Sequence, residues 1–265
     1  MSAATISRQR SRIPGPVDTY APPTSLQPPI VSSNLVLWLD AGSSASYPGT
    51  GTTWKDISPS AFSCLLINSP IYNAGNGGYF TFNGRDTYGF IASNAAFAFG
   101  TGDFTVEAWV WVNSRSDTYQ HLGGTHNGGV GQGWYTSLVN AGLYHVNTNQ
   151  DLGFGYFHEG NGGLGLMPIG VWKHVVFCRI GGMIRFYRDT VVGPTVLNFG
   201  SVSIENFGNP LLIGAIKNYG QLPVHGDDGI YNLKGRIAQF RIYKGKGLTQ
   251  AEVTNNYNAH ISRYS

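Results

Sequence analysis

The stretch FTVEAWVWV (104–112) decides the fold. Purely apolar residues alternate strictly with polar or amphipathic ones, and a period of two is the signature of a β-strand. One face holds Phe104, Val106, Ala108, Val110 and Val112, and the other holds Thr105, Glu107, Trp109 and Trp111. Because the first face is entirely apolar, we predict that this strand packs against a hydrophobic core.

A β-hairpin is predicted further along the chain. The runs HVVFCRI (174–180) and MIRFYRD (183–189) flank Gly181-Gly182. Two glycines between apolar runs supply the positive φ angles that a two-residue primed turn needs. The two runs should therefore pair as antiparallel strands.

Other short apolar runs extend this pattern in both directions. They are LVLWLD (35–40), SCLLI (63–67), GYFTFNG (78–84) and GRIAQFRIYKG (235–245). In the last run, Ala238, Phe240 and Ile242 are expected on one face, opposite Gln239, Arg241 and Tyr243. Short segments between turn signals favour an antiparallel sandwich over βαβ units.

One helix is predicted, in LTQAEVTNNYNAH (248–260). Thr249 is a suitable N-cap, and Glu252 stands three residues later to complete a capping box. Leu248 can pack on Val253 as a hydrophobic staple, and Val253 and Tyr257 share the helix face that would dock on the sandwich.

Composition bounds the class of protein. The 265 residues include 37 Gly, 15 Tyr, 14 Phe and 6 Trp but few charges, which excludes a disordered or coiled-coil chain. A β-sandwich of this size is commonly one domain, and we predict it over residues 34–265. Cys64 and Cys178 lie in apolar runs, which predicts buried free thiols rather than a disulfide framework.

The first 33 residues differ from the rest. They are rich in Ser, Arg and Pro, and the prolines block helix and sheet, which predicts an extended arm. Arg8, Arg10 and Arg12 lie in the first dozen residues, which contain no acid, so the chain after them carries 14 basic and 14 acidic residues and is neutral. A neutral body matches phosphate backbones poorly, which makes nucleic acid an unfavoured partner.

No targeting or membrane segment is predicted. The first 30 residues contain no apolar h-region, and no apolar run reaches about 18 residues, the length of a membrane span. The sequence therefore predicts a chain that is made in a cytoplasm and has no membrane partner.

Five segments together resemble a known family, the laminin-G-like or concanavalin A-like lectin/glucanase jelly rolls. They are LVLWLDAGSSASYPGTGTTWKDIS (35–58), YFTFNGRDTYGFI (79–91), FTVEAWV (104–110), GVWKHVVFCRIGGMIRFYRDTVVG (170–193) and GRIAQFRIYKGKGLTQAEVTNNYNA (235–259). The resemblance implies an all-β, antiparallel, two-sheet jelly-roll sandwich with one short C-terminal helix and an extended N-terminal arm. The opening segment is similar to versions in virion proteins of tailed bacteriophages, which implies capsid decoration or a head or tail appendage.

Because the family includes glucanases, an enzyme of this kind would need a pair of catalytic Asp or Glu residues at the right spacing. The glucanase pattern resembles E-x-D-x-x-E, but the residue two positions after each of the four glutamates is not an acid. Asp103 and Glu107 lie on the same face of a strand, four residues apart, so their Cα atoms would be about 13 Å apart. The paired carboxyl groups of glycosidases lie about 5 to 9.5 Å apart. No G-x-S-x-G motif occurs, and His174, at the family's W-x-H position, is expected to be structural. The sequence predicts that the chain is not an enzyme.

Binding candidates were chosen by side-chain chemistry. Aromatic faces beside polar groups suit sugars, and the candidates are Trp109, Trp111, Glu107, Trp134 and Tyr135; the alternative is that loops or neighbouring subunits cover these rings. Calcium, the one cofactor considered, needs hard oxygen ligands, and the candidates are Asp227, Asp228, Asn232, Asn147, Asn149 and Asp151. Solvated turns are the alternative for those residues.

These observations lead to a functional hypothesis. We expect a virion structural protein whose arm binds another virion protein, such as the major capsid protein, while the jelly roll faces outward. The partner-binding residues of the arm would be Arg8, Arg10, Arg12, Pro14, Pro16 and Tyr20; an inert linker or expression leader is the alternative. A homo-oligomer, including a trimer, fits such arms. The competing hypothesis is a carbohydrate-binding lectin for cell-surface glycans, with or without calcium, and a glycoside hydrolase ranks third.

Overall fold

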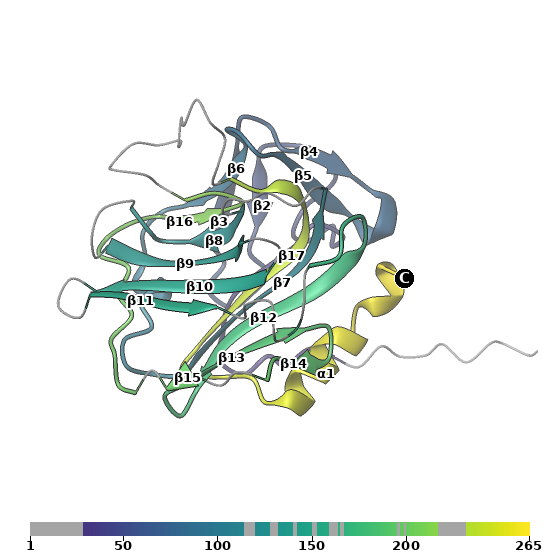
Figure 1. Ribbon diagram of the computed structural model, residues 1–265. Coiled ribbons are helices and arrows are strands. Elements are labelled where there is room, and N and C mark those ends of the chain that lie inside the picture. Colours follow the sequence, from purple (N-terminus) through teal and green to yellow (C-terminus); the bar gives the residue numbers. More distant parts are fainter. Residues whose placement is uncertain are drawn as a thin grey trace, which may run out of the picture.

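Two antiparallel sheets lie face to face in the computed structural model (Figure 1). The structure describes residues 29–113, 120–127, 132–139, 142–149, 153–158, 164, 167–194, 197–198, 200–216 and 232–265. Within them the chain forms the two-sheet jelly-roll sandwich that the sequence predicts.

Sheet A carries the strands that the sequence patterns identify most clearly. Its main path runs β14-β13-β12-β7-β17-β5-β4, with β1 on β17 and β15 on β13. The strands are β1 (Leu35–Asp40), β4 (Ile71–Asn73), β5 (Tyr79–Asn83), β7 (Phe104–Val112), β12 (Trp172–Ile180), β13 (Met183–Arg188), β14 (Val191–Val192), β15 (Leu197–Asn198) and β17 (Lys234–Lys244). β7 lies between β12 and β17, so both of its edges are paired; one face packs in the core between the sheets, and Trp109 on the other face packs against the C-terminal segment.

Sheet B runs β11-β10-β9-β8-β16-β6-β3-β2. The strands are β2 (Thr53–Lys55), β3 (Ser63–Ile67), β6 (Tyr88–Ile91), β8 (Gln120–Gly124), β9 (Gln132–Val139), β10 (Gly142–Asn149), β11 (Gly153–His158) and β16 (Leu211–Ile213). The described residues also form three 3-10 helices: η1 (Gly75–Gly77), η2 (Ala95–Phe97) and η3 (Ile261–Arg263).

The main core fills the space between the sheets. The apolar face of β7 packs there against residues of both sheets, as its alternation predicts. The fit is close at Gly123 of β8, where an added Cβ would lie 2.7 Å from the ring of Phe240 on β17. Larger residues at position 123 would therefore force the sheets apart.

Two local predictions are confirmed. Gly181 and Gly182 turn the β12–β13 hairpin with φ angles of 57° and 79°. Helix α1 (Gln250–Asn258) begins at Thr249, whose side chain accepts a hydrogen bond from the Glu252 backbone while the Glu252 side chain accepts one from the Thr249 backbone.

Helix α1 covers the outer face of sheet A (Figure 1). Leu248 and Val253, the predicted staple, lie in one apolar cluster with Val176 of β12 and Tyr243 of β17. The part of the outer face of sheet A that lies beneath α1 is thus a second interior. This arrangement decides which of the predicted binding residues can reach a ligand.

One strand differs from its predicted pattern. The register of β17 against β7 shifts between Ile237 and Gln239, the mark of a β-bulge. The extra residue puts Ile237, not Ala238, in the main core with Phe240 and Ile242, whereas Ala238 packs on the outer face. The prediction that Ala238 shares the face of Phe240 is therefore wrong.

Residues 29–31 already belong to the packed structure, although the sequence predicts an arm up to residue 33. Val31 donates its backbone N–H to Asn256 Oδ1 at 2.8 Å, and its carbonyl accepts from the Tyr243 hydroxyl at 3.0 Å. Asn255 of α1 donates to the Pro29 carbonyl at 2.7 Å. The segment that precedes β1 is therefore held against α1.

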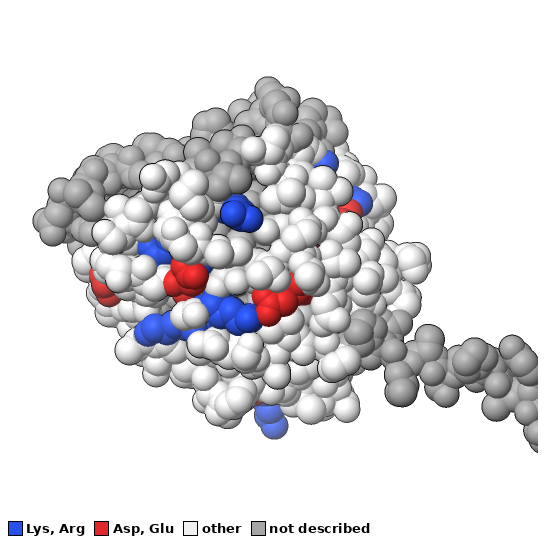
Figure 2. Space-filling model, turned by 90° about the horizontal axis from the view of Figure 1, so that it is seen from below, with Lys and Arg blue, Asp and Glu red and all other residues white. Residues whose placement is uncertain are grey.

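Surface charge is sparse and mixed on the face that carries α1. In Figure 2, Lys and Arg side chains lie next to Asp and Glu side chains within a mostly uncharged surface. Lys173–Asp189 and Lys246–Glu252 are ion pairs of this kind. Cys64 and Cys178 are buried free thiols, as predicted. Among the described residues, no helix is long and apolar enough to cross a membrane.

Candidate functional site

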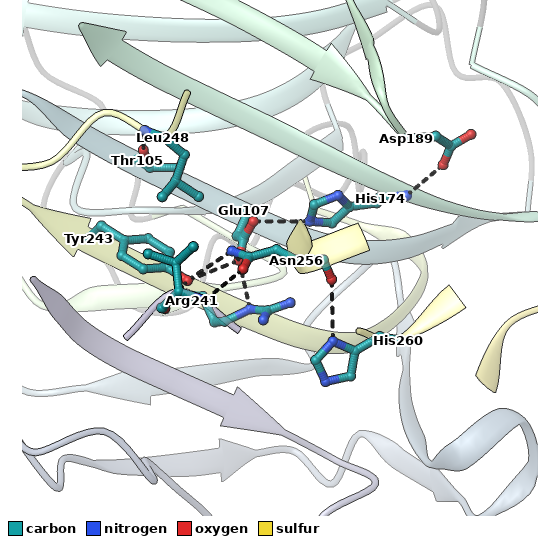
Figure 3. Close-up of polar contacts among 10 residues, drawn as sticks. Thr105, Glu107, His174, Asp189, Arg241, Tyr243, Leu248, Asn256 and His260 are labelled. Carbon is teal, nitrogen blue, oxygen red and sulfur yellow. Dashed lines mark hydrogen bonds and ion pairs between the residues drawn. The ribbon is translucent and has the colours of Figure 1, made fainter. Parts of the chain in front are cut away.

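A buried polar cluster centred on Glu107 joins sheet A to α1 (Figure 3). Arg241 on β17 places its Nε 2.8 Å from Glu107 Oε1, and His174 on β12 places its Nε2 3.0 Å from Oε2. Asn256 of α1 donates to Oε1 at 2.9 Å, and the Tyr243 hydroxyl lies 3.4 Å from the same oxygen. Three strands and the helix thus meet at one carboxylate.

The electrostatics of the cluster keep Glu107 ionised. Burial alone would raise the pKa of Glu107, but the Arg241 guanidinium and the hydrogen bonds from His174 and Asn256 outweigh it and lower the pKa to about 2. The side chain has no exposed surface. A carboxylate that is charged, sealed and occupied by donors cannot protonate a leaving group, so this cluster has a structural role.

Trp109 lies over the same cluster and is covered by the C-terminal segment. Its ring stacks on His174 at 5.2 Å and on Tyr257 of α1 at 5.4 Å, and the Tyr264 ring lies 4.3 Å away. Trp109 and Glu107 are both 0% exposed. The prediction that these two residues contact a sugar is wrong, because α1 and η3 close over their face of β7.

Trp134 is also wrongly predicted as a ligand residue. The sequence suggested a loop, but Trp134 lies in β9, is 0% exposed, and donates its Nε1–H to the Phe97 carbonyl at 2.7 Å. Its neighbour Tyr135 is 7% exposed and stands edge-on to His121 and His126. Neither ring offers an open face.

The calcium candidates do not converge in the described structure. Asn232 is buried and donates its amide to the Arg85 carbonyl at 2.6 Å. Asn147 and Asn149 lie in β10, not in a turn, and their side chains are outside the described part. Asp151, Asp227 and Asp228 lie outside the described residues. Within those residues, no group of three or more His, Cys, Asp or Glu side chains is placed to hold a metal ion.

Trp111 differs from the other predicted aromatics because it is partly exposed. The strand registers place it in a row across the outer face of sheet A that begins beside the C-terminal segment, where Tyr264 contacts Trp172 at 5.1 Å, and runs away from it. The row consists of Ile71 on β4, Thr81 on β5, Arg236 on β17, Trp111 on β7 and Trp172 on β12. We call this set the open row.

The open row has an apolar end, a polar middle and an aromatic wall. Ile71 is 70% exposed, and Thr81 and Arg236 are partly exposed. The Arg236 Cζ lies 4.7 Å from the centre of the Trp111 ring, and Trp172 stands edge-on to Trp111 at 5.9 Å. Trp172 is 6% exposed, so the accessible part of the row consists of Ile71, Thr81, Arg236 and Trp111. An aromatic ring, a hydroxyl and a cation on an accessible surface are what saccharide binding needs.

The residues of the predicted arm, Arg8, Arg10, Arg12, Pro14, Pro16 and Tyr20, lie outside the described residues. The structure therefore describes the start of the sandwich, not the predicted contacts of the arm.

The described sandwich has the architecture of the jelly rolls that lectins and glucanases share. A family model described as the concanavalin A-like lectin/glucanases superfamily matches residues 75–254, and the chain belongs to this superfamily. No curated protein sequence matches the chain.

Solved structures with the same fold include binding domains of clostridial toxins. The binding domain of Paraclostridial Mosquitocidal Protein 1 has a TM-score of 0.65 at 17% identity, with 86% of this chain and 52% of that chain covered. The binding domain of botulinum neurotoxin serotype D has a TM-score of 0.62 at 12% identity, with 87% and 52% covered. The ligand-binding domain of the same serotype in complex with N-acetylneuraminic acid scores 0.61 at 11% identity, with 87% and 52% covered. The likeness is one of fold, and the chain spans about half the length of these structures.

Proposed function

We propose that this chain is a non-catalytic, lectin-like binding module that contacts glycans through the open row of sheet A. The observation that carries the proposal is the division of the outer face. Glu107 and Trp109 are sealed beneath α1 and η3, whereas Trp111, Arg236 and Thr81 remain accessible beside them. Glu107 therefore stabilises the fold, and the accessible part of the open row is the surface that can bind a ligand.

Two further findings support a glycan as the partner. The superfamily to which the chain belongs is described by its lectins and glucanases, and the carboxylate that could have served a glucanase is fully engaged by donors. One fold neighbour is a ligand-binding domain in complex with N-acetylneuraminic acid.

A glycan array with matched variants tests the proposal. Wild type should bind at least one class of cell-surface or bacterial glycan, and Trp111→Ala should lose most of that binding. Phe207→Ala is the control, because Phe207 is 46% exposed but lies in the loop before β16 of sheet B. A chain that binds no glycan, or that releases reducing sugar from a polysaccharide, would refute the proposal.

We propose in addition that the module is displayed on a virion by its N-terminal arm. The resemblance to phage virion proteins expected from the sequence of residues 35–58 motivates this proposal, and the way the structure holds residues 29–31 supports it. The hydrogen bonds from Asn255, Asn256 and Tyr243 fix the point at which a preceding segment leaves the sandwich. An arm that starts from a fixed point can present the sandwich in one orientation to a capsid protein or to copies of itself.

Truncation at the packed boundary tests the display proposal. Removing residues 1–28 should leave the midpoint of thermal unfolding nearly unchanged, because the hydrogen bonds of residues 29–31 are kept. The same truncation should abolish incorporation into particles. Native mass spectrometry of both forms would show whether the arm also holds subunits together. Incorporation of the truncated chain at full occupancy would contradict the display proposal without affecting glycan binding.

A further inference from the structure

We infer that the open row selects acidic saccharides, with the Arg236 guanidinium binding the carboxylate of the sugar. This inference rests on the proposed function and specifies the ligand of the same site. It follows from three observations: how Arg236 is held, which charges surround it, and which neutral groups lie beside it.

Arg236 is held by rings and not by acids. Its Cζ lies 5.0 Å from the centre of the Tyr79 ring and 4.7 Å from that of Trp111, so aromatic rings flank the guanidinium. Ring stacking uses the faces of a guanidinium, whereas its N–H donors point outward in its plane. Stacking therefore orients Arg236 while leaving donors free.

Those donors have no partner in the described part of the chain. The Arg236 side chain takes part in none of its ion pairs, and the Nε is buried there with no hydrogen-bond partner. Arg241, the buried arginine two strand positions beyond the bulge on the same face, is in contrast paired with Glu107. A planar fork of oriented donors matches a carboxylate, which can accept two of them at once.

A second cation lies on the same face. Lys234 precedes Arg236 by two positions on β17, so both side chains point to the outer face. Lys234 is exposed and, within the described residues, forms no ion pair. Asp86, in the turn between β5 and β6, accepts from the Asn83 amide at 2.7 Å and pairs with neither cation. Among the described residues, Lys234 and Arg236 are therefore two cations on one face without a paired acid.

The neighbouring neutral groups favour a saccharide over a peptide. Thr81 lies beside Arg236 in the row, and Asn113, whose backbone N–H bonds to the Lys234 carbonyl, is exposed at the end of β7. A hydroxyl and an amide can exchange hydrogen bonds with sugar hydroxyls. Adjacent strands lie about 4.8 Å apart, so the accessible part of the row, across the four strands from β4 to β7, is about 14 Å long, enough for a short oligosaccharide.

Three ligands that separate charge from ring structure test the inference. Trigalacturonic acid and its trimethyl ester differ in charge but not in ring structure, and a triglutamate peptide carries the same charge without sugar rings. Affinities of the full-length chain for all three would be measured by calorimetry. The variants are Arg236→Gln, Arg236→Lys and Lys234→Gln, with Lys55→Gln as control, because Lys55 is exposed on β2 of sheet B.

The inference predicts a specific pattern. Trigalacturonic acid should bind at least about 10-fold more tightly than the ester, and Arg236→Gln should remove that difference. Arg236→Lys should weaken binding less, since it keeps charge but loses the fork. Lys234→Gln should cost about three-fold, and Lys55→Gln nothing. Because Lys234 makes no side-chain contact on which the fold depends, its result stands even if an Arg236 variant fails to fold.

Other outcomes overturn the inference in distinguishable ways. Equal binding of acid and ester that is lost in Trp111→Ala would refute acid selection and leave the proposed function intact. Absence of binding to either sugar and to every glycan on the array would refute both. If triglutamate bound as tightly as trigalacturonic acid, the ligand would be an acidic peptide and not a saccharide. If the Arg236 and Lys234 variants bound trigalacturonic acid as tightly as wild type does, the ligand would bind at another site.

Discussion

Replacing Glu107 with Gln tests whether the buried cluster holds the C-terminal helix to sheet A. The substitution keeps the size of the side chain but leaves the buried Arg241 guanidinium without a counter-charge and turns an amide N–H toward other donors. Removing one partner of a buried ion pair costs about 3–5 kcal/mol. Domains of this kind are stable by about 5–15 kcal/mol, so the variant should fold but unfold at much lower urea concentration.

The Glu107 carboxylate should also make the free energy of unfolding fall at acid pH. The pKa of Glu107 is lowered from 4.5 to about 2 in the fold, so its contribution is complete above about pH 4.5 and is lost as the pH falls toward 2. At about 1.4 kcal/mol per pH unit, the loss for wild type is about 3 kcal/mol. Urea unfolding of wild type and Glu107→Gln between pH 7 and pH 2 measures both quantities, and the variant should lack this part of the acid loss.

A double substitution provides the control. Glu107→Leu with Arg241→Met replaces the pair by apolar groups of similar size and should be less destabilising than Glu107→Leu alone, because no buried charge is left unpaired. If Glu107→Gln cost less than about 1 kcal/mol at pH 7, or if the double variant were the sum of its parts, the cluster would not be the link between α1 and the sheet.

Three further predictions concern other parts of the outer face. Thr249→Ala removes the N-cap of α1 and should cost about 1 kcal/mol, whereas Thr254→Ala, inside the helix, should cost less; equal losses in urea unfolding would contradict the capping geometry. Trp109→Ala should cost about 3–5 kcal/mol, because its ring is fully buried among aromatic rings, and a small loss would mean that η3 does not cover it. Cys64 and Cys178 are buried, and burial raises the pKa of each thiol to about 12, so both should resist a thiol reagent at pH 8 until urea unfolds the chain; rapid labelling of either in the native state would contradict this.

The sequence allowed most of sheet A to be predicted, because its strands carry local signals. The alternation in β7, the Gly181-Gly182 turn and the Thr249–Glu252 capping box each depend on residues close together in the chain. The β17 bulge was not predicted, because a shift between Ile237 and Gln239 is visible only against the register of β7.

The binding residues were harder to predict, for a physical reason. The alternation of β7 shows that Glu107, Trp109 and Trp111 share a face, but not which of them α1 and η3 cover. That depends on where residues about 150 positions later dock, as the Asn256–Glu107 hydrogen bond illustrates. Arg236 was missed altogether, because its place beside Trp111 follows from strand order. The alternation of Lys234 and Arg236 along β17 was the available signal.

The indole N–H signals of the six tryptophans provide the most direct test of the central claim, which is that the open row of sheet A is the ligand surface and the rest of the outer face is interior. A ¹H–¹⁵N spectrum of the full chain would be recorded during titration with a glycan that binds, with the Trp111 signal assigned through Trp111→Phe. The account predicts that the signal of Trp111, and at most that of its neighbour Trp172, moves, while those of the buried Trp109 and Trp134 stay in place. Movement of the Trp109 or Trp134 signal with Trp111 unchanged would contradict it.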